Sequence, residues 1–303
     1  MISIDSTLPA LPDHLQCHVL VGDALRQQGY RGRFAPTPSG PLHLGNLRTA
    51  LVSWLVARLA QGQWQLRVDD LDTPRVRAGA IDSAFEDLRW LGLHWDGPVV
   101  LQSERRGLYA SVLSHLRRHQ RVYACRCSRR ELAQWPRYPG TCRSLQRAWG
   151  WEQQRLPAWR LRVQGIEGVE CGDVVVRRAD GFIAYHLATA VDELCFGITE
   201  VVRGADLQPV KEAQVAVMAA LGSAAPRYRH VPLLCDASGH KLAKREGSEG
   251  LMPWRERGAR PEQVVGHLAA QLQLVPAGSV ISASELVEEM VHQCQSLNGL
   301  LEP

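Results

Sequence analysis

The sequence predicts an α/β protein built on an open sheet. Three stretches of the chain predict this fold class. Residues 31–35 read as a short strand that ends in the turn PTPSG, and residues 44–61 carry apolar side chains at helical spacing. Residues 63–68 read as a second, buried strand that runs into the acidic sequence DDLD. A strand, a Gly/Pro loop and a helix therefore follow one another, and the N-terminus of such a helix can hold phosphate.

The loop before this helix differs from the common phosphate-binding motifs. It contains neither GxxxxGK[ST] nor GxGxxG. Its distinctive feature is His43, two residues before Gly45, where a ligand could approach the backbone closely. Taken alone, an isolated His-x-Gly is more often a histidine that makes a structural hydrogen bond at a helix start than a ligand-binding residue.

Composition bounds the class of protein. The chain has 303 residues and a net charge of +4, which is compatible with nucleic-acid binding but not diagnostic of it. No segment reaches about 18 consecutive apolar residues, and the N-terminus lacks the pattern of a secretory signal. We therefore expect a cytoplasmic protein without a membrane span.

A second motif lies far downstream of the first. The sequence HKLAKR, residues 240–245, follows His43 by roughly 200 residues. Residues 31–49 resemble the HIGH region of class I aminoacyl-tRNA synthetases, in the form used by the glutamyl group, and HKLAKR resembles the KMSKS signature. The resemblance covers residues 31–275 and is closest to the shortened paralogues of glutamyl-tRNA synthetase, the glutamyl-Q tRNA(Asp) synthetases.

The resemblance implies a Rossmann-like class I catalytic core with a zinc-containing insertion and a short helical C-terminus. The implied parts are an N-terminal extension (1–30), the first half of the core (31–115), a zinc-containing and acceptor-like insertion (116–181), the second half of the core with the KMSKS-like loop (182–250), and a helical C-terminal segment without an anticodon-binding domain (251–303). From periodicity we expect further helices at 14–28, 81–91, 107–120, 185–196 and 210–221, and strands at 158–163, 172–177, 197–207 and 230–234.

The reaction that the resemblance implies has two steps. ATP activates L-glutamate to glutamyl-adenylate, and the glutamyl group then passes to queuosine in the anticodon loop of tRNA(Asp). Mg²⁺ is expected with ATP. We expect a monomer.

The resemblance also assigns site residues. His43 and Gly45 would meet the phosphates of ATP, together with Lys244 and Lys241 of HKLAKR, and His43, Gly45 and Lys244 would form the catalytic set. Two arginines suit the two carboxylates of glutamate. The glutamate-binding residues would be Arg33, Ala35, Thr37, Asp69, Tyr185 and Arg203.

Three positions depart from the pattern of the glutamyl group. Asp69 stands where that group usually has Glu to meet the amino group of the amino acid. Because Asp is one methylene shorter, the contact would run through water or require a shifted substrate. Asn46 stands where HIGH ends in His, and Ala243 replaces the serine of KMSKS, which should weaken activity rather than abolish it.

A cluster of cysteines predicts a metal site. Cys125, Cys127 and Cys142 are three soft thiolates close in sequence, which suit zinc better than a disulfide framework. From the residues alone the fourth ligand stays open between water, Tyr138 and a remote Cys or His; the resemblance assigns it to Tyr138. One structural zinc ion per chain is expected, and the alternative is three unliganded buried cysteines.

Two other functions compete with this interpretation. One is a truncated glutamyl-tRNA synthetase that charges the 3′ end of a tRNA. The other is a non-catalytic tRNA-binding remnant, although His43 and Lys244, the residues that such a remnant would lose, are both present.

Overall fold

A computed structural model describes residues 11–163, 166, 169–232, 250–293, 297–299 and 301. The chain forms two compact units. The first unit comprises Met1–Gln27, Gln102–Gly197 and Pro209–Ala225, and the second comprises Gln28–Leu101, Ile198–Gln208 and Pro226–Pro303. Among the described helices, none is both long and apolar enough to span a lipid bilayer.

The second unit contains the parallel strands. Strands β1 (Arg31–Phe34), β2 (Gln63–Val68) and β3 (Val100–Leu101) form one sheet in the order β1-β2-β3, and β7 (Glu200–Gly204) pairs with β8 (Arg227–Val231). Strands β1 and β7 lie side by side, where the backbone N–H of Thr199 donates to the carbonyl of Arg31 at 2.9 Å. The strands therefore run in the spatial order 3-2-1-7-8, the arrangement of a doubly wound nucleotide-binding sheet.

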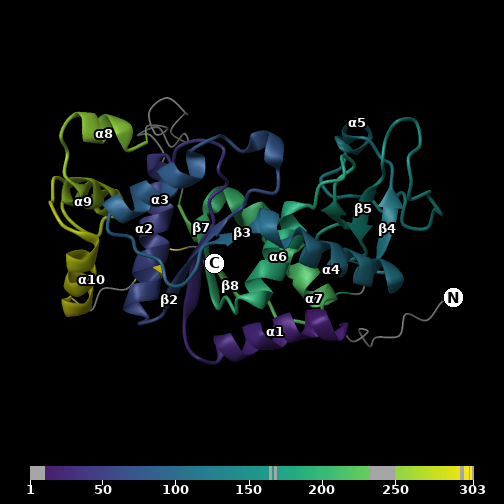
Figure 1. Ribbon diagram of the computed structural model, residues 1–303, viewed down its shortest axis with the longest axis horizontal. Helices are drawn as coiled ribbons and strands as arrows, with labels where there is room; N and C mark the ends of the chain where they lie inside the picture. The colour runs from purple at the N-terminus through teal and green to yellow at the C-terminus, as the bar shows by residue number, and fades with distance from the viewer. Residues whose placement is uncertain are drawn as a thin grey trace. The chain divides into compact units, whose positions relative to one another are not determined.

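Helix α2 (Leu44–Leu59) is the centre of this unit. Leu47, Leu51 and Leu55 are fully or almost fully buried at a spacing of four residues, as the sequence predicted. The helix packs on β1, β2 and β7 and also on α9 (Pro261–Gln271) and α10 (Ala283–His292), which lie beside it in Figure 1. Because neighbours surround it, α2 is apolar on nearly every face. The unit is completed by α3 (Ala80–Trp90) and α8 (Met252–Glu256).

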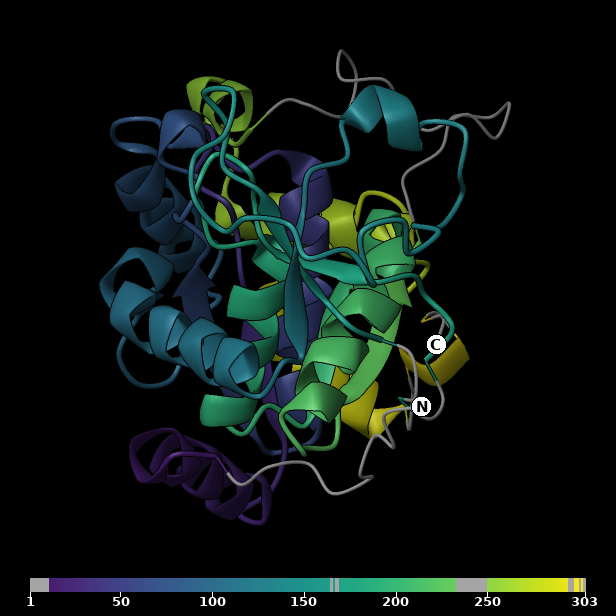
Figure 2. The same ribbon diagram turned by 90° about the vertical axis from the view of Figure 1, so that its right-hand side faces the viewer.

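The first unit combines helices with an antiparallel sheet. Its elements are α1 (Asp13–Arg26), α4 (Arg106–Arg118), β4 (Val122–Cys125), α5 (Arg129–Leu132), β5 (Ala158–Leu161), β6 (Val174–Arg177), α6 (Tyr185–Cys195) and α7 (Lys211–Ala220). The sheet has the order β4-β5-β6. Figures 1 and 2 both show α6 and α7 lying next to each other, in green.

Two close approaches hold the helices of the first unit. A Cβ at Gly22 of α1 would lie only 1.8 Å from the carbonyl oxygen of Leu194, so only glycine lets α1 meet α6 this closely. In α6 itself, the buried carboxylate of Asp192 accepts hydrogen bonds from Gln102, Arg105 and Tyr109. This network ties α6 to α4 and to the short turn before it.

Most predicted elements are present, with shifted ends. The last core strand was predicted at 230–234 but is β8 at Arg227–Val231, so this boundary was wrong. Parallel pairing with β7, from Glu200–Arg227 to Gly204–Val231, determines where β8 begins, and the local sequence does not show that partner. The strands predicted at 158–163, 172–177 and 197–207 are likewise shorter.

Candidate active site and metal cluster

His43 occupies the N-cap of α2, at the loop where the sequence predicts phosphate binding. Its Nδ1 accepts a hydrogen bond from the backbone N–H of Asn46 at 3.2 Å, and Asn46 Oδ1 accepts one from the backbone N–H of His43 at 3.3 Å. This reciprocal pair is a capping box. An Nδ1 that accepts carries no proton, so the neutral ring has its N–H at Nε2. His43 itself is exposed.

Gly45 leaves room for this arrangement. A Cβ at position 45 would lie 3.0 Å from Cε1 of His43 and 3.1 Å from its Nδ1, closer than nearly all real Cβ contacts. A side chain here would require the imidazole to shift by a few tenths of an ångström. Gly45 therefore leaves the His43 ring its present position, in addition to allowing the close ligand approach that the sequence predicts.

The two predicted glutamate-binding arginines come from neighbouring strands of the second unit. Arg33 lies in β1 and Arg203 in β7, and both are at least 95% buried. Arg33 Nη1 donates to the carbonyl of Val202 at 3.1 Å. The guanidinium of Arg203 lies 3.4 Å from Nε2 of His230 and stacks over the ring of Tyr228 at 4.8 Å. Two planar donors on adjacent strands are suited to binding carboxylates.

Asp69 follows the end of β2 and is also buried. Both of its carboxylate oxygens accept from Arg67, at 2.7 and 3.2 Å. Its backbone N–H donates to the carbonyl of Pro36 at 3.0 Å, which ties the end of β2 to the loop after β1. Arg67 is not among the predicted site residues; a charged side chain in a strand predicted to be buried was the available signal.

Other predicted site residues differ in their surroundings. Ala35 and Thr37 lie directly after β1, with Thr37 exposed. Tyr185 is the first residue of α6 and belongs to the first unit, where its ring meets that of His186. Lys241, Ala243 and Lys244 lie outside the described residues, so their roles stay predictions.

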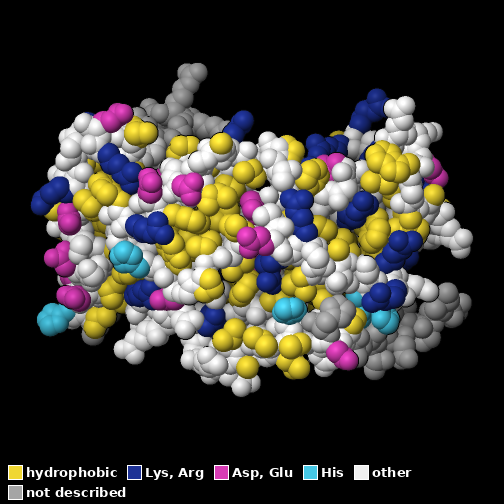
Figure 3. All heavy atoms as spheres, in the orientation of Figure 1, with side chains coloured by type: hydrophobic (Ala, Val, Ile, Leu, Met, Phe, Trp, Pro, Cys, Tyr) yellow, Lys and Arg dark blue, Asp and Glu magenta, His cyan; other side chains and the backbone are white. Residues whose placement is uncertain are grey.

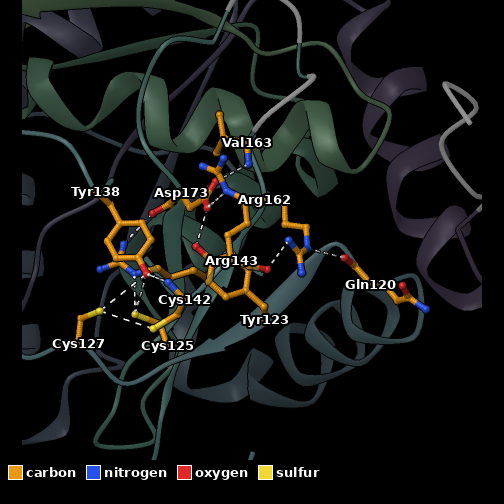
Figure 4. A network of polar contacts seen from close by, with 11 residues as sticks. Gln120, Tyr123, Cys125, Cys127, Tyr138, Cys142, Arg143, Arg162, Val163 and Asp173 are labelled. Carbon is orange, nitrogen blue, oxygen red and sulfur yellow. Dashed lines mark hydrogen bonds and ion pairs between the residues drawn. The ribbon is translucent and has the colours of Figure 1, made fainter. Parts of the chain in front are cut away.

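Cys125, Cys127 and Cys142 come together in the first unit, as the spacing predicted. Their sulfur atoms all lie within 4.8 Å of one another, and those of Cys127 and Cys142 are 3.6 Å apart (Figure 4). A tetrahedral zinc ion with Zn–S distances of about 2.3 Å would hold its sulfur ligands about 3.8 Å apart. The cluster could therefore bind a metal ion.

Tyr138 points its hydroxyl at the same centre. The oxygen lies 3.4 Å from the sulfur of Cys125 and 3.8 Å from that of Cys127, and it accepts the backbone N–H of Cys142 at 2.9 Å. Burial raises the pKa of the Cys127 thiol to about 12. Three thiols and a phenol packed this closely match the donor set of a thiolate metal site.

A buried carboxylate supports the cluster from outside. Asp173 accepts hydrogen bonds from Tyr123 at 2.5 Å and from Arg143 at 2.7 Å, and Arg143 is the neighbour of Cys142 (Figure 4). Arg160 of β5 donates to the sulfur of Cys125 at 3.3 Å and lies 3.8 Å from the centroid of the Tyr138 ring. Its positive charge would offset the negative charge of a thiolate cluster.

Comparison with known proteins identifies the family. Residues 30–147 and 160–294 match the family described as tRNA synthetases class I (E and Q), catalytic domain. The chain belongs to this family. As a class I synthetase of the E and Q group, it has the mixed α/β catalytic fold that the sequence predicted, with the HIGH-like loop at the start of α2.

Two similar proteins of this synthetase family share a name, and a solved structure has the same fold. The chain is 62% identical to the glutamyl-Q tRNA(Asp) synthetase of Synechococcus sp. (strain CC9605), over 94% of this chain and 97% of that protein. It is 59% identical to the protein of that name from Prochlorococcus marinus (strain MIT 9313), over 97% and 98%. A solved glutamate tRNA ligase from Elizabethkingia meningosepticum, in complex with its amino acid, superposes with a TM-score of 0.68 at 26% identity, over 86% of this chain and 64% of that one.

Proposed function

We propose that this synthetase activates glutamate with ATP and transfers the glutamyl group to queuosine in the anticodon loop of tRNA(Asp), in the cytoplasm. The observation that carries the proposal is the 62% identity, nearly end to end, to a protein named glutamyl-Q tRNA(Asp) synthetase. The buried pair Arg33 and Arg203 supports glutamate as the amino acid, since it has two carboxylates to bind.

In the first step an oxygen of the glutamate α-carboxylate attacks the α-phosphorus of ATP, and the bond to pyrophosphate breaks. The chain contributes position and positive charge. The Nε2–H of His43 donates a hydrogen bond to a phosphate oxygen, since Nδ1 already accepts the hydrogen bond of the cap. Lys244, with Lys241, balances the charge on the leaving pyrophosphate. Mg²⁺ bound with ATP would neutralise part of the phosphate charge.

Arg33 and Arg203 hold the carboxylates of glutamate, and Ala35 and Thr37 of the same unit contribute to its site. Tyr185 is assigned to glutamate by the family resemblance alone. Asp69 meets the amino group of the substrate while it keeps its ion pair with Arg67. A bidentate arginine uses one lone pair on each carboxylate oxygen, so the others can still accept a hydrogen bond. In the second step a hydroxyl of queuosine attacks the carbonyl of glutamyl-adenylate, and AMP leaves.

One structural zinc ion would be held by Cys125, Cys127, Cys142 and Tyr138. The distances between these donor atoms support this assignment, because they suit tetrahedral coordination. The metal would stabilise the segment between β4 and β5, which contains Cys127, Tyr138 and Cys142 and begins directly after Cys125.

The decisive experiment maps the label on tRNA. Purified protein is incubated with radioactive glutamate, ATP and tRNA(Asp), either with queuosine or as an unmodified transcript, and the tRNA is then cut with nuclease. Label should appear in the anticodon loop of the modified tRNA alone. Label on the 3′-terminal adenosine would instead support a truncated glutamyl-tRNA synthetase, and the absence of glutamate-dependent pyrophosphate exchange would support a non-catalytic remnant.

A further inference from the structure

The loop of residues 148–155 presents an exposed tryptophan. It falls in the gap between the two ranges that match the synthetase family, so the family pattern does not explain it. Trp151 is 70% exposed. Trp149, two residues earlier, is packed against other side chains. Its ring meets that of Trp159 edge to face at 4.8 Å, and Arg117 stacks on it at 4.4 Å.

An arginine within the cysteine cluster anchors this loop. Arg126 lies between the first two cysteines of the cluster. Its guanidinium donates to the carbonyls of Ala148 at 3.0 Å and Gly150 at 2.6 Å. It also donates to the carbonyl of Arg155 at 3.1 Å, and its Nε pairs with Glu152 at 2.8 Å. The loop is therefore fixed on both sides of the exposed indole.

The C-terminal end of the loop is anchored by Arg155. Arg155 donates to the carbonyls of Arg126 at 3.4 Å and Cys127 at 3.1 Å. Glu152 and Arg155 exchange backbone hydrogen bonds at 3.1 and 3.0 Å around a tight two-residue turn. An indole on a loop this well anchored loses little conformational entropy when a ligand stacks on it.

The surroundings of the loop are strongly basic. Residues 121–162 contain ten arginines and two glutamates, a net charge of +8 in a chain whose total is +4. Arg129, Arg130 and Arg147 are exposed. Figure 3 shows dark blue side chains gathered over the part of the molecule that holds α5, β4 and β5, among yellow ones and with few magenta ones. Such a surface attracts a polyanion.

We propose that Trp151 is a stacking platform for an unpaired base of the substrate RNA, with the exposed arginines around it as phosphate contacts. This inference rests on the proposed function, which makes the anticodon loop of a tRNA the substrate. Unpaired bases in RNA loops are commonly bound by aromatic side chains, whereas paired bases in a helix cannot stack in this way. An exposed, rigid indole in a segment rich in arginine suits an unpaired base.

The test measures RNA affinity directly. The probes are a synthetic hairpin with the sequence of the tRNA(Asp) anticodon stem and loop, made without queuosine, and a blunt duplex of the same stem. Wild-type protein should bind the hairpin more tightly than the duplex. Trp151→Ala should weaken hairpin binding about 5- to 100-fold and leave duplex binding within about twofold, while Trp151→Phe should retain most of the affinity.

A matched tryptophan and a salt titration sharpen the result. Trp135 is 52% exposed in the same unit but lies outside the loop, so Trp135→Ala should bind the hairpin like wild type. The slope of log affinity against log salt should stay unchanged in Trp151→Ala, which removes no charge. It should fall by about 0.7 in Arg147→Gln if that arginine meets one phosphate of the unpaired loop.

Three outcomes would overturn the inference: equal affinity of the wild type for hairpin and duplex, wild-type hairpin affinity in Trp151→Ala, or an equal loss in Trp135→Ala. Thermal unfolding and bound metal should match wild type in each variant, which separates loss of stacking from loss of fold. Because the probe lacks queuosine, a protein that binds it through Trp151 but labels no tRNA would refute the proposed transfer and keep the stacking role.

Discussion

Asn46 and His43 each accept a hydrogen bond from the backbone of the other, at 3.3 and 3.2 Å, across the first turn of α2. The residue that departs from the HIGH pattern therefore closes the cap that orients the histidine. Because Nδ1 of His43 is the acceptor in this cap, the ring presents Nε2–H as its donor. The structural and the catalytic interpretations of His43 are compatible, since the two ring nitrogens serve different partners.

The first prediction separates the two roles of His43. Asparagine is among the best N-cap residues, so His43→Asn should keep the free energy of unfolding within about 0.5 kcal/mol of wild type. Loss of the imidazole donor should lower glutamate-dependent pyrophosphate exchange by about two to three orders of magnitude. His43→Ala, which loses both functions, should also destabilise the protein by about 1 kcal/mol. Near-normal exchange in His43→Asn would leave His43 a capping residue only.

The second prediction concerns Arg203. Lysine keeps the charge but not the planar fork, so Arg203→Lys should raise the KM for glutamate about 10- to 100-fold and change the KM for ATP little. Arg229→Lys is the matched control: Arg229 lies in the adjacent strand β8 and pairs with Glu200 at 3.2 Å. Steady-state pyrophosphate exchange measures both constants. An equal rise in both KM values, or the same effect in the control, would argue against a glutamate contact.

The third prediction tests the metal and its fourth ligand. Elemental analysis of protein purified without chelator should find about one zinc per chain. Tyr138→Phe should release the metal at a lower chelator concentration than wild type, because it loses the ligand oxygen but keeps the ring under Arg160. Tyr123→Phe removes a neighbouring phenol whose partner is Asp173, and it should hold zinc like wild type. Folded, active protein without zinc would refute the assignment.

The fourth prediction follows from Asp87 in α3. Burial raises the pKa of this carboxyl from 3.8 to about 6, although Arg255 of α8 lies 3.0 Å away and opposes the shift. The folded state therefore binds more protons than the unfolded state between about pH 4 and 6, so the free energy of unfolding falls as pH rises through this range. Asp87→Asn should remove a pH dependence of about 2–3 kcal/mol, measured by urea unfolding at several pH values.

A neighbouring carboxylate controls for general charge effects. Glu86 is exposed on the same helix, and Glu86→Gln should keep the fall in stability between pH 4 and 6. If Asp87→Asn retains the full pH dependence, another group is its source.

Much of this architecture could be predicted from the sequence because the signals are local. The apolar spacing of α2, the turn after β1 and the buried strand β2 depend on neighbours within a few residues, and all three are present. The cysteine cluster was also predictable, since its three ligands lie within one short stretch. Family membership followed from two motifs in a fixed order, and the comparison confirmed it.

Other features depend on partners distant in the chain. The start of β8 is determined by its register with β7, and buried Arg33 of β1 finds its acceptor in the carbonyl of Val202 on β7. No local pattern shows that Arg126 clamps residues 148–155, or that Asp173 supports Cys142 through Arg143. The sequence by itself determined the elements, the family and the candidate ligands. Only the tertiary structure decided which polar groups are buried together, because the cost of burying a charge depends on the partner that the fold brings to it.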